Sequence, residues 1–436
     1  MRVKNSILII IALLSATQLF AKQLSEKGLA EYSVLTEQNA IALALDNNPN
    51  LAQMKARYEA MKNIPSQVGT LPDPMLTLGA INFPTDSFDR TQEGMTQLQI
   101  GFSQAFPFPG KLTLKEDVAE FEAKAAFYDV TEMRLLLTKN VSNKWWQIFY
   151  LDRAIETVDK NQALLKQFIE VAKTKYTTGK GLQQDVLLSQ LELSKLINQK
   201  IEIVALKESQ IIQLNILMDI APRSAINLPQ QLDSNKPHLL SEESLYQLAI
   251  KSRPLLQKHK QLVSAANSRL DLAERDYYPD FNVGITYGDR SGQNPISMGG
   301  NRADLFSIKL GIKIPLYASS KQSYKVKQRI SEKYKSKYAY LDETNQVKAD
   351  IANNMTDYRR AVQQRSLFET GILPQARQTV QSMLAGYQVS EVDFLNLVRS
   401  QVTLFNYELQ FWQSVSQSNQ ALARLQASIG KENIYE

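Results

Sequence analysis

Few of the residue types that usually carry chemistry occur in this chain. It has no cysteine and only two histidines, His238 and His259. Cysteine nucleophiles, disulfides, zinc ribbons and iron–sulfur clusters are therefore excluded, and a histidine-rich metal site has little to draw on. The pair Gly110-Lys111 lacks the upstream glycine that a phosphate-binding loop requires. Met54 and Met61 lie two helical turns apart, a spacing at which methionine usually fills gaps in a core rather than binding a metal.

The remaining composition also argues against catalysis and against nucleic-acid binding. Acidic residues are scattered along helix surfaces, and no nucleophile, base and orienting group stand in a recognisable set. The net charge of +6 is spread along 436 residues instead of being clustered. The sequence predicts no catalytic, cofactor-binding or metal-binding residue, no nucleic-acid partner and no enzyme activity.

The N-terminus has the pattern of a secretory signal peptide. Two basic residues precede an apolar run at 7–14, and small residues lead to Ala21. The run is too short to span a bilayer as a helix. We expect residues 1–21 to be removed on export.

The elements that must position any functional group are mostly very long helices. Only 17 glycines and 15 prolines interrupt the chain, and none falls between Lys111 and Thr178. Apolar residues at 148–176 alternate between spacings of three and four, which indicates a coiled-coil seam. We predict helices at about 111–178, 182–219, 320–388 and 392–430, paired as two antiparallel hairpins.

Four short segments alternate apolar and polar residues, as membrane β-strands do. The clearest is 304–314, where Phe306, Ile308 and Leu310 alternate with Ser307 and Lys309. The others are predicted at about 75–81, 95–106 and 280–288. Alternation is also typical of a soluble sandwich, but the rest of the chain offers no second sheet. Because four strands cannot close a barrel, several chains must contribute.

The chain repeats one pattern twice. Each half has a short helix that leads to a proline, a pair of strands and a long helical hairpin. We assign residues 22–220 to the first repeat and 240–430 to the second, with a proline-containing linker at 221–239 and a tail at 431–436. Tyr, Ser and Gln coincide in the ungapped match of 176–190 to 387–401.

These features together resemble the TolC family of outer-membrane efflux ducts. The resemblance rests on 71–74 (LPDP), 101–111 (GFSQAFPFPGK) and the segments between the paired long helices, and it covers about residues 35–430. It implies a mainly α fold with a small membrane β part. Coiled-coil hairpins would form an α-barrel in the periplasm, and four strands per chain would join a trimeric β-barrel of about twelve strands in outer-membrane lipid.

The first two segments are most similar to the heavy-metal branch, the outer components of cobalt–zinc–cadmium and copper–silver exporters. The resemblance then implies a homotrimeric passive duct that works with a periplasmic adaptor (membrane fusion protein) and an inner-membrane RND-type pump. A duct for multidrug efflux or type I protein secretion is the alternative. A periplasmic coiled-coil adaptor is the alternative from a different class, although no lipoyl-like domain is evident.

The resemblance also points to two groups of functional residues at the helix reversals. The reversals are predicted to dock the adaptor: Gly179, Lys180 and Gly181 in one half, and Ser390, Glu391 and Val392 in the other. Relatives often carry a ring of acids at the closed entrance. Here the matching run is 396–399 (NLVR), so Asn396 and Arg399 replace the acids, while Asp185 and Asp393 lie nearby. We predict that these four residues form the periplasmic aperture and that Arg399 pairs with Asp393, Asp185 or Glu391; a merely solvated Arg399 is the alternative.

Overall fold

The computed structural model describes residues 34–230, 239–431 and 433–435. The predicted signal peptide, and residues 231–238 of the predicted linker, lie outside the described residues. Among the described helices, none has a stretch that is both long and apolar enough to cross a bilayer.

The chain divides into two compact units that do not coincide with the two sequence repeats. The first contains the described parts of Met1–Met54, Val130–Pro254 and Thr344–Glu436, and the second contains Lys55–Asp129 and Leu255–Glu343. Each unit therefore takes elements from both halves of the sequence.

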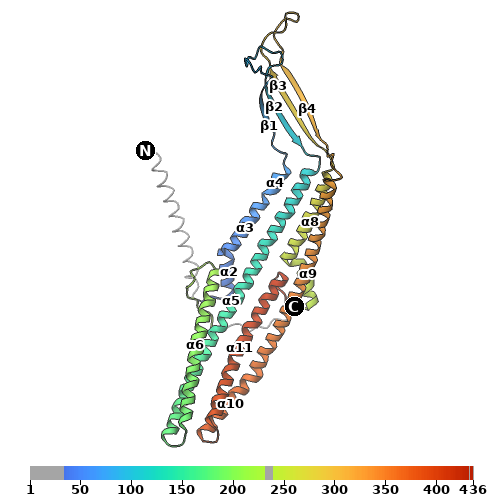
Figure 1. Cartoon of the computed structure of the whole chain (residues 1–436). Coiled ribbons are helices and arrows are strands. Elements are labelled where there is room, and N and C mark those ends of the chain that lie inside the picture. The colour runs from blue at the N-terminus through green and yellow to red at the C-terminus, as the bar shows by residue number, and fades with distance from the viewer. Residues whose placement is uncertain (1–33, 231–238, 432, 436) are drawn as a thin grey trace, which may run out of the picture. The chain divides into compact units, whose positions relative to one another are not determined.

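The second unit contains a four-stranded antiparallel sheet (Figure 1). Its strands lie in the order β1 (Met75–Ile81), β2 (Gln97–Phe106), β3 (Asp280–Asp289) and β4 (Leu305–Lys313). The pairing of β2 with β3 joins the two halves of the sequence, with Gly101 opposite Thr286. Among the described residues, β1 pairs only with β2 and β4 only with β3, so each outer strand has one open edge there. The predicted combination of long helices and four antiparallel strands is confirmed.

One face of this sheet is apolar on all four strands. The register places Leu310 opposite Val283, and Ile308 opposite Ile285. Leu310 is 65% exposed and Ile308 is 72% exposed. The large exposed side chains of this face are Leu76, Leu78, Leu98, Ile100, Phe102, Phe106, Val283, Ile285, Tyr287, Phe306, Ile308, Leu310 and Ile312. An apolar face of this extent marks a contact with lipid or with another protein.

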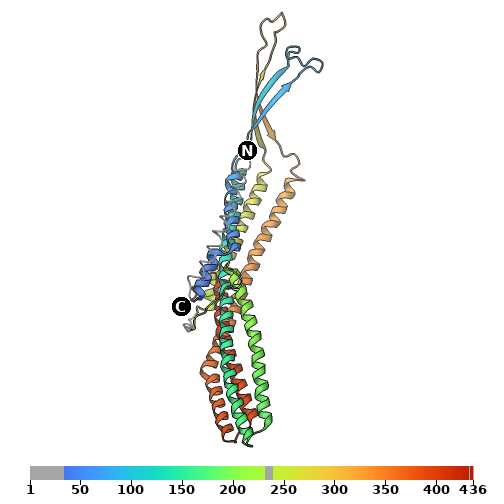
Figure 2. The same ribbon diagram turned by 90° about the vertical axis from the view of Figure 1, so that its left-hand side faces the viewer.

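The long helices form two hairpins (Figures 1 and 2). The first consists of α5 (Lys111–Thr177) and α6 (Gln183–Leu217). The second consists of α9 (Gln322–Leu367), η1 (Phe368–Ile372), α10 (Leu373–Gln388) and α11 (Phe394–Ile429). In the first unit, α5 and α11 share an aromatic core in which Trp145 stacks on Phe149 at 5.7 Å and Phe149 contacts Trp412 at 6.1 Å.

The helix predicted over 320–388 is interrupted by the π-helical turn η1. Pro374 has no backbone N–H, and Gly371 lowers the local helix propensity. The N–H of Leu373 bonds to the carbonyl of Phe368, five residues earlier. Helix α5 contains neither glycine nor proline and continues for 67 residues.

The short helices show the sequence repeat at the level of local chemistry. They are α2 (Glu37–Asn47), α3 (Pro49–Lys62), α4 (Ile64–Gly69), α7 (Glu242–Ser252) and α8 (Pro254–Arg275). The Thr36 hydroxyl caps α2 by accepting from Asn39 N at 3.2 Å, and the Ser241 hydroxyl caps α7 by accepting from Ser244 N at 3.3 Å. A proline then begins both α3 and α8, where its missing N–H costs no helical hydrogen bond.

Candidate functional site: the tips of the helical hairpins

The first hairpin reverses direction between α5 and α6. Gly179 has a φ of +68°, a conformation that residues with a Cβ rarely adopt. Gly181 is needed for a different reason, since a Cβ there would lie 2.8 Å from the Cβ of Lys175. Lys180 lies between the two glycines and is exposed. The tight turn thus presents the Lys180 side chain to solvent.

The second hairpin reverses between α10 and α11 with similar geometry. Ser390, which matches Gly179 in the repeat, has a φ of +67°. A Cβ at Gly386 would lie 2.6 Å from a methyl group of Val392, so the close approach of Val392 requires this glycine. Glu391 is exposed. The two tips therefore present charges of opposite sign, one from Lys180 and one from Glu391.

Lys175 of α5 joins the first tip to the second. Its Nζ donates to the backbone carbonyl of Tyr387 and, at 3.0 Å, to Ser390 Oγ. The same Nζ lies 4.4 Å from the centre of the Tyr387 ring, within the range of a cation–π contact. A single side chain thus satisfies a carbonyl at the end of α10 and orients the Tyr387 ring.

Tyr387 makes a second polar link, to α6. Its hydroxyl donates to Asp185 Oδ2 at 3.5 Å. Burial raises the pKa of the Asp185 carboxyl, and the nearby negative charge of Asp393 raises it further. Burial also raises the pKa of Tyr387 to about 12, with a further contribution from Asp185. The hydroxyl therefore keeps its proton at neutral pH and remains a donor.

An apolar cluster surrounds this polar contact. Tyr387 is 4% exposed, and its ring lies 5.0 Å from the ring of Phe394, measured between centroids. The buried members of the cluster are Leu165, Phe168, Ala172, Tyr387, Phe394, Leu397 and Val398. We name Lys175, Asp185, Tyr387 and Ser390 the tip latch, because they connect the first hairpin to the second beside this cluster.

The remaining residues predicted for the aperture lie on or next to α11. Asp393 is at its N-cap position, but its side chain makes no capping hydrogen bond. Asn396 and Arg399 are exposed. Within the described part of one chain, Arg399 forms no ion pair, and the carboxylate of Asp185 is bound by Tyr387 instead.

Lys175 and Tyr387 were not among the residues predicted from the sequence. The available signal was the coincidence of Tyr176 with Tyr387 in the repeat match. The repeat match gives the two tyrosines the same importance. In the structure, however, Tyr176 is 48% exposed and Tyr387 is buried.

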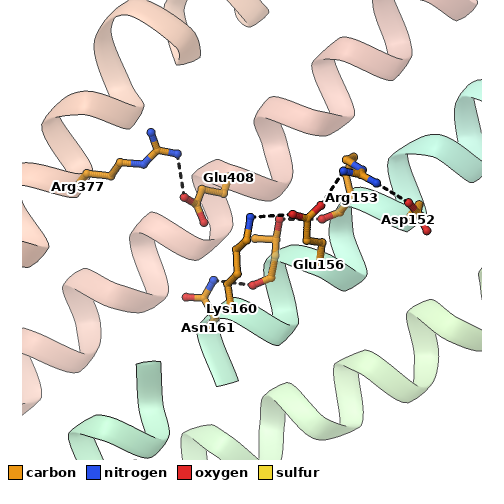
Figure 3. Close-up of polar contacts among 8 residues, drawn as sticks. Asp152, Arg153, Glu156, Lys160, Asn161, Arg377 and Glu408 are labelled. Atoms are coloured by element: carbon orange, nitrogen blue, oxygen red, sulfur yellow. Dashed lines mark hydrogen bonds and ion pairs between the residues drawn. The ribbon is translucent and has the colours of Figure 1, made fainter. Parts of the chain in front are cut away.

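Further from the tips, Gln401 of α11 donates to Asn161 Oδ1 of α5 at 2.6 Å and so joins the two hairpins, whereas the ion pairs drawn in Figure 3 each lie within one hairpin. On α5, Arg153 bridges Asp152 and Glu156, at 2.7 Å each. In the other hairpin, Arg377 of α10 pairs with Glu408 of α11 at 3.1 Å. These ion pairs are partly buried, and each supports the helices of a single hairpin.

No group of three or more His, Cys, Asp or Glu side chains that could hold a metal ion occurs among the described residues. The tips instead provide two features: contacts that join neighbouring helices, and the exposed charges of Lys180 and Glu391.

Comparison with known families accounts for this arrangement. The profile of the family described as "Outer membrane efflux protein" matches residues 40–221 and 245–431, one segment in each half of the chain. The chain belongs to the outer membrane efflux protein family. The first matched segment ends at residue 221 and the second at residue 431, each one residue beyond the end of the corresponding predicted repeat.

Members of the outer membrane efflux protein family are similar to this chain along most of its length. The outer membrane protein TolC of Vibrio cholerae is 22% identical over 408 residues, covering 88% of this chain and 89% of that protein. The TolC-family resemblance of the sequence is therefore confirmed at the level of the family.

Solved structures of channels share the fold. VceC from Vibrio cholerae matches with a TM-score of 0.75 and 18% identity, covering 91% of this chain and 96% of that chain. The outer-membrane channel OprN matches with a TM-score of 0.75 and 16% identity, covering 90% and 89%. CusC matches with a TM-score of 0.74 and 14% identity, covering 92% and 93%.

As a member of the outer membrane efflux protein family, the protein is an outer-membrane efflux channel with a periplasmic helical extension, and it is not an enzyme. Channels of this family act with an adaptor and an inner-membrane pump. The alternative that the chain is itself the periplasmic adaptor is thereby excluded.

Proposed function

We propose that three copies of this chain form one passive duct, whose wall in the membrane is a closed barrel of about twelve strands. The open-edged, two-faced sheet is the observation that carries the proposal. Unpaired N–H and C=O groups at the edges of β1 and β4 are not tolerated in hydrocarbon. Pairing the β4 edge of one copy with the β1 edge of the next would satisfy both edges and turn the apolar face outward, toward lipid.

We expect the purified protein in detergent to be a trimer at every temperature at which it is folded. Light scattering with detergent correction measures the mass of the particle, and heating before electrophoresis tests whether the assembly dissociates as it unfolds. Because a lone copy would leave both sheet edges unpaired in hydrocarbon, we expect assembly and folding to be lost together. A folded, monodisperse monomer would contradict the closed barrel.

The tips are proposed to dock the periplasmic adaptor. Lys180 and Glu391 support this role because both are exposed and neither takes part in the tip latch. The glycines beside Lys180 have a structural role as well, since Gly179 adopts a positive φ and a Cβ at Gly181 would clash with Lys175.

Bulky or charge-reversing changes at these two positions, Lys180→Glu and Glu391→Lys, are expected to abolish efflux while leaving trimers intact. Each change removes a charge that an adaptor would contact without altering any packed side chain. Each variant is expressed in a strain that lacks the parent gene, and the tolerance of that strain to the exported compound is measured. Trimer yield is the control. Unchanged tolerance in both variants would count against docking at the tips.

The cargo proposed from the sequence resemblance is heavy-metal cations, with multidrug efflux or type I protein secretion as the alternative. The structure gives the 101–111 segment a structural role. Phe108 N donates to Asp280 Oδ1 at 2.9 Å, the Phe108 ring stacks on Tyr278 at 4.5 Å, and Gly110 has a φ of +88°. These contacts hold the junction of β2 with α5, so the segment carries little information on cargo.

A further inference from the structure

The face of the sheet opposite the apolar one is polar and built from small side chains. The register places Gly101 beside Thr286, and Thr286 beside Ser307. A groove of about 420 Å³ runs over this face. Its polar and small lining residues are Thr77, Gly79, Gln99, Gly101, Ser103, Asn282, Gly284, Thr286, Lys309 and Gly311. In the proposed duct the apolar face meets lipid, so this face must line the water-filled lumen.

Very few charges occur on this polar face. Strands β1 and β2 contain no charged residue. On β3 and β4 the charged residues of the polar face are Asp280, Lys309 and Lys313. Asp289, at the other end of β3, belongs to the apolar face by register and pairs with Arg90 of the neighbouring loop.

The negative charge of Asp280 is neutralised locally. Lys111 Nζ lies 2.8 Å from Asp280 Oδ1, and the Lys111 side chain is 8% exposed. Asp280 also accepts the hydrogen bond from Phe108 N and lies opposite Lys313 in the register. Asp276, on the preceding segment, is shared by Lys111 and Lys325. This end of the sheet therefore presents no uncompensated acid.

Lys309 differs from the other charged groups because it stands alone. It is the central residue of β4, it is exposed, and it lies opposite Gly284, which in turn lies opposite Ser103. Among the described residues, no carboxylate forms an ion pair with it. Its ammonium group is thus an unpaired positive charge at mid-height of the polar face, surrounded by small neutral side chains.

We infer that Lys309 makes the barrel lumen of this channel selective for anions. The inference rests on the proposed duct, in which three copies place three Lys309 side chains at one level around the water-filled path. Rings of lysine or arginine favour anions in a pore, as rings of aspartate or glutamate favour cations. The four strands provide no ring of unpaired acids that would offset the positive charge of the Lys309 ring.

The consequence concerns the cargo. Bare divalent metal cations would meet a repulsive ring at mid-barrel, whereas anionic or neutral molecules would pass more readily. The lumen chemistry therefore favours cargo that is anionic or neutral, and it disfavours the free heavy-metal cations suggested by the sequence resemblance.

The test is the reversal potential of single channels in a planar bilayer under a KCl gradient, at low ionic strength because salt screens the ring. The parent protein is expected to show a chloride-to-potassium permeability ratio above one. A change of about one kT in the local potential alters the concentration of a monovalent ion about threefold. We expect Lys309→Glu to lower the ratio by at least about this factor, and the matched control Lys431→Glu, an exposed residue after α11, to leave it unchanged.

Because the chain has no cysteine, Lys309→Cys supplies a single reactive thiol. A cationic methanethiosulfonate should restore the anion preference of this variant and an anionic one should reverse it, while the cysteine-free parent should respond to neither. A cation-selective parent, or a permeability ratio that none of these changes moves, would overturn the inference while leaving the duct intact. A parent that does not conduct at all would instead overturn the duct on which the inference rests.

Discussion

Leu310→Arg should prevent assembly of the protein in outer membranes. Leu310 lies in the middle of β4 on the apolar face and is 65% exposed in one chain. An arginine on the lipid-facing side of a barrel strand costs about 2–4 kcal/mol near the bilayer midplane, and the trimer would bear this cost in every copy. The measurement is the amount of heat-dissociable trimer in the outer-membrane fraction of cells that express each variant.

The matched control is its neighbour on the opposite face, Lys309→Glu. This change exchanges one charged side chain for another in contact with water, so we expect trimers at the level of the parent. Leu310→Met is a second control, because it keeps an apolar side chain of similar volume. If the arginine variant assembled as well as the glutamate variant, the assignment of the two faces would be wrong.

The strands and their facing were predictable because they depend on a local rule. Side chains of a strand alternate between its two faces, so the alternation around Ile308 and Leu310 determines which residues share a side. The pairing of β2 with β3 could not be predicted from such a local rule. The strands are separated by a long stretch of helical sequence, and register between distant strands depends on the packing of the whole sheet.

The helices were predictable for a similar reason, and their irregularities were not. The absence of glycine and proline is enough to expect one continuous α5. Gly371 and Pro374 lie close together in the second long helix, but composition alone does not say whether the result is a kink, a break or a π turn. The contact of the Phe368 carbonyl with the Leu373 N–H settles this in favour of the π turn.

The tip residues show most clearly which contacts cannot be predicted from the sequence. Gly179 and Gly181 stand out in the sequence because glycine favours a tight reversal. Lys175 and Tyr387 have ordinary helical positions, and their importance follows from a separation of 212 residues in sequence that the fold closes to hydrogen-bond distance. Arg399 stands out in the sequence because it replaces an acid of the relatives. In one chain it remains an exposed side chain, so its proposed pairing would have to involve another copy.

The entrance of the channel should open more easily when the tip latch is weakened. Tyr387→Phe removes the hydroxyl that donates to Asp185 Oδ2 and keeps the ring that packs on Phe394. A hydrogen bond to a charged acceptor contributes about 1.5–3 kcal/mol, and the long 3.5 Å contact belongs at or below the low end of that range. Since 1.4 kcal/mol corresponds to about a tenfold change in an equilibrium constant, we expect the open fraction to rise by up to about tenfold.

Single-channel conductance of purified trimers in planar bilayers measures this change. Asp185→Ala should act in the same direction, and the double variant with Tyr387→Phe should add little, because both remove one contact. Lys175→Met should have the largest effect, since it removes the bond to Ser390, the bond to the Tyr387 carbonyl and the cation–π contact together. Arg399→Ala tests the separate proposal that Arg399 pairs at the aperture. Conductance could instead rise for Arg399→Ala and stay unchanged for Tyr387→Phe and Lys175→Met. That outcome would contradict a gate formed by the tip latch within one chain and would support a gate formed by ion pairs between copies.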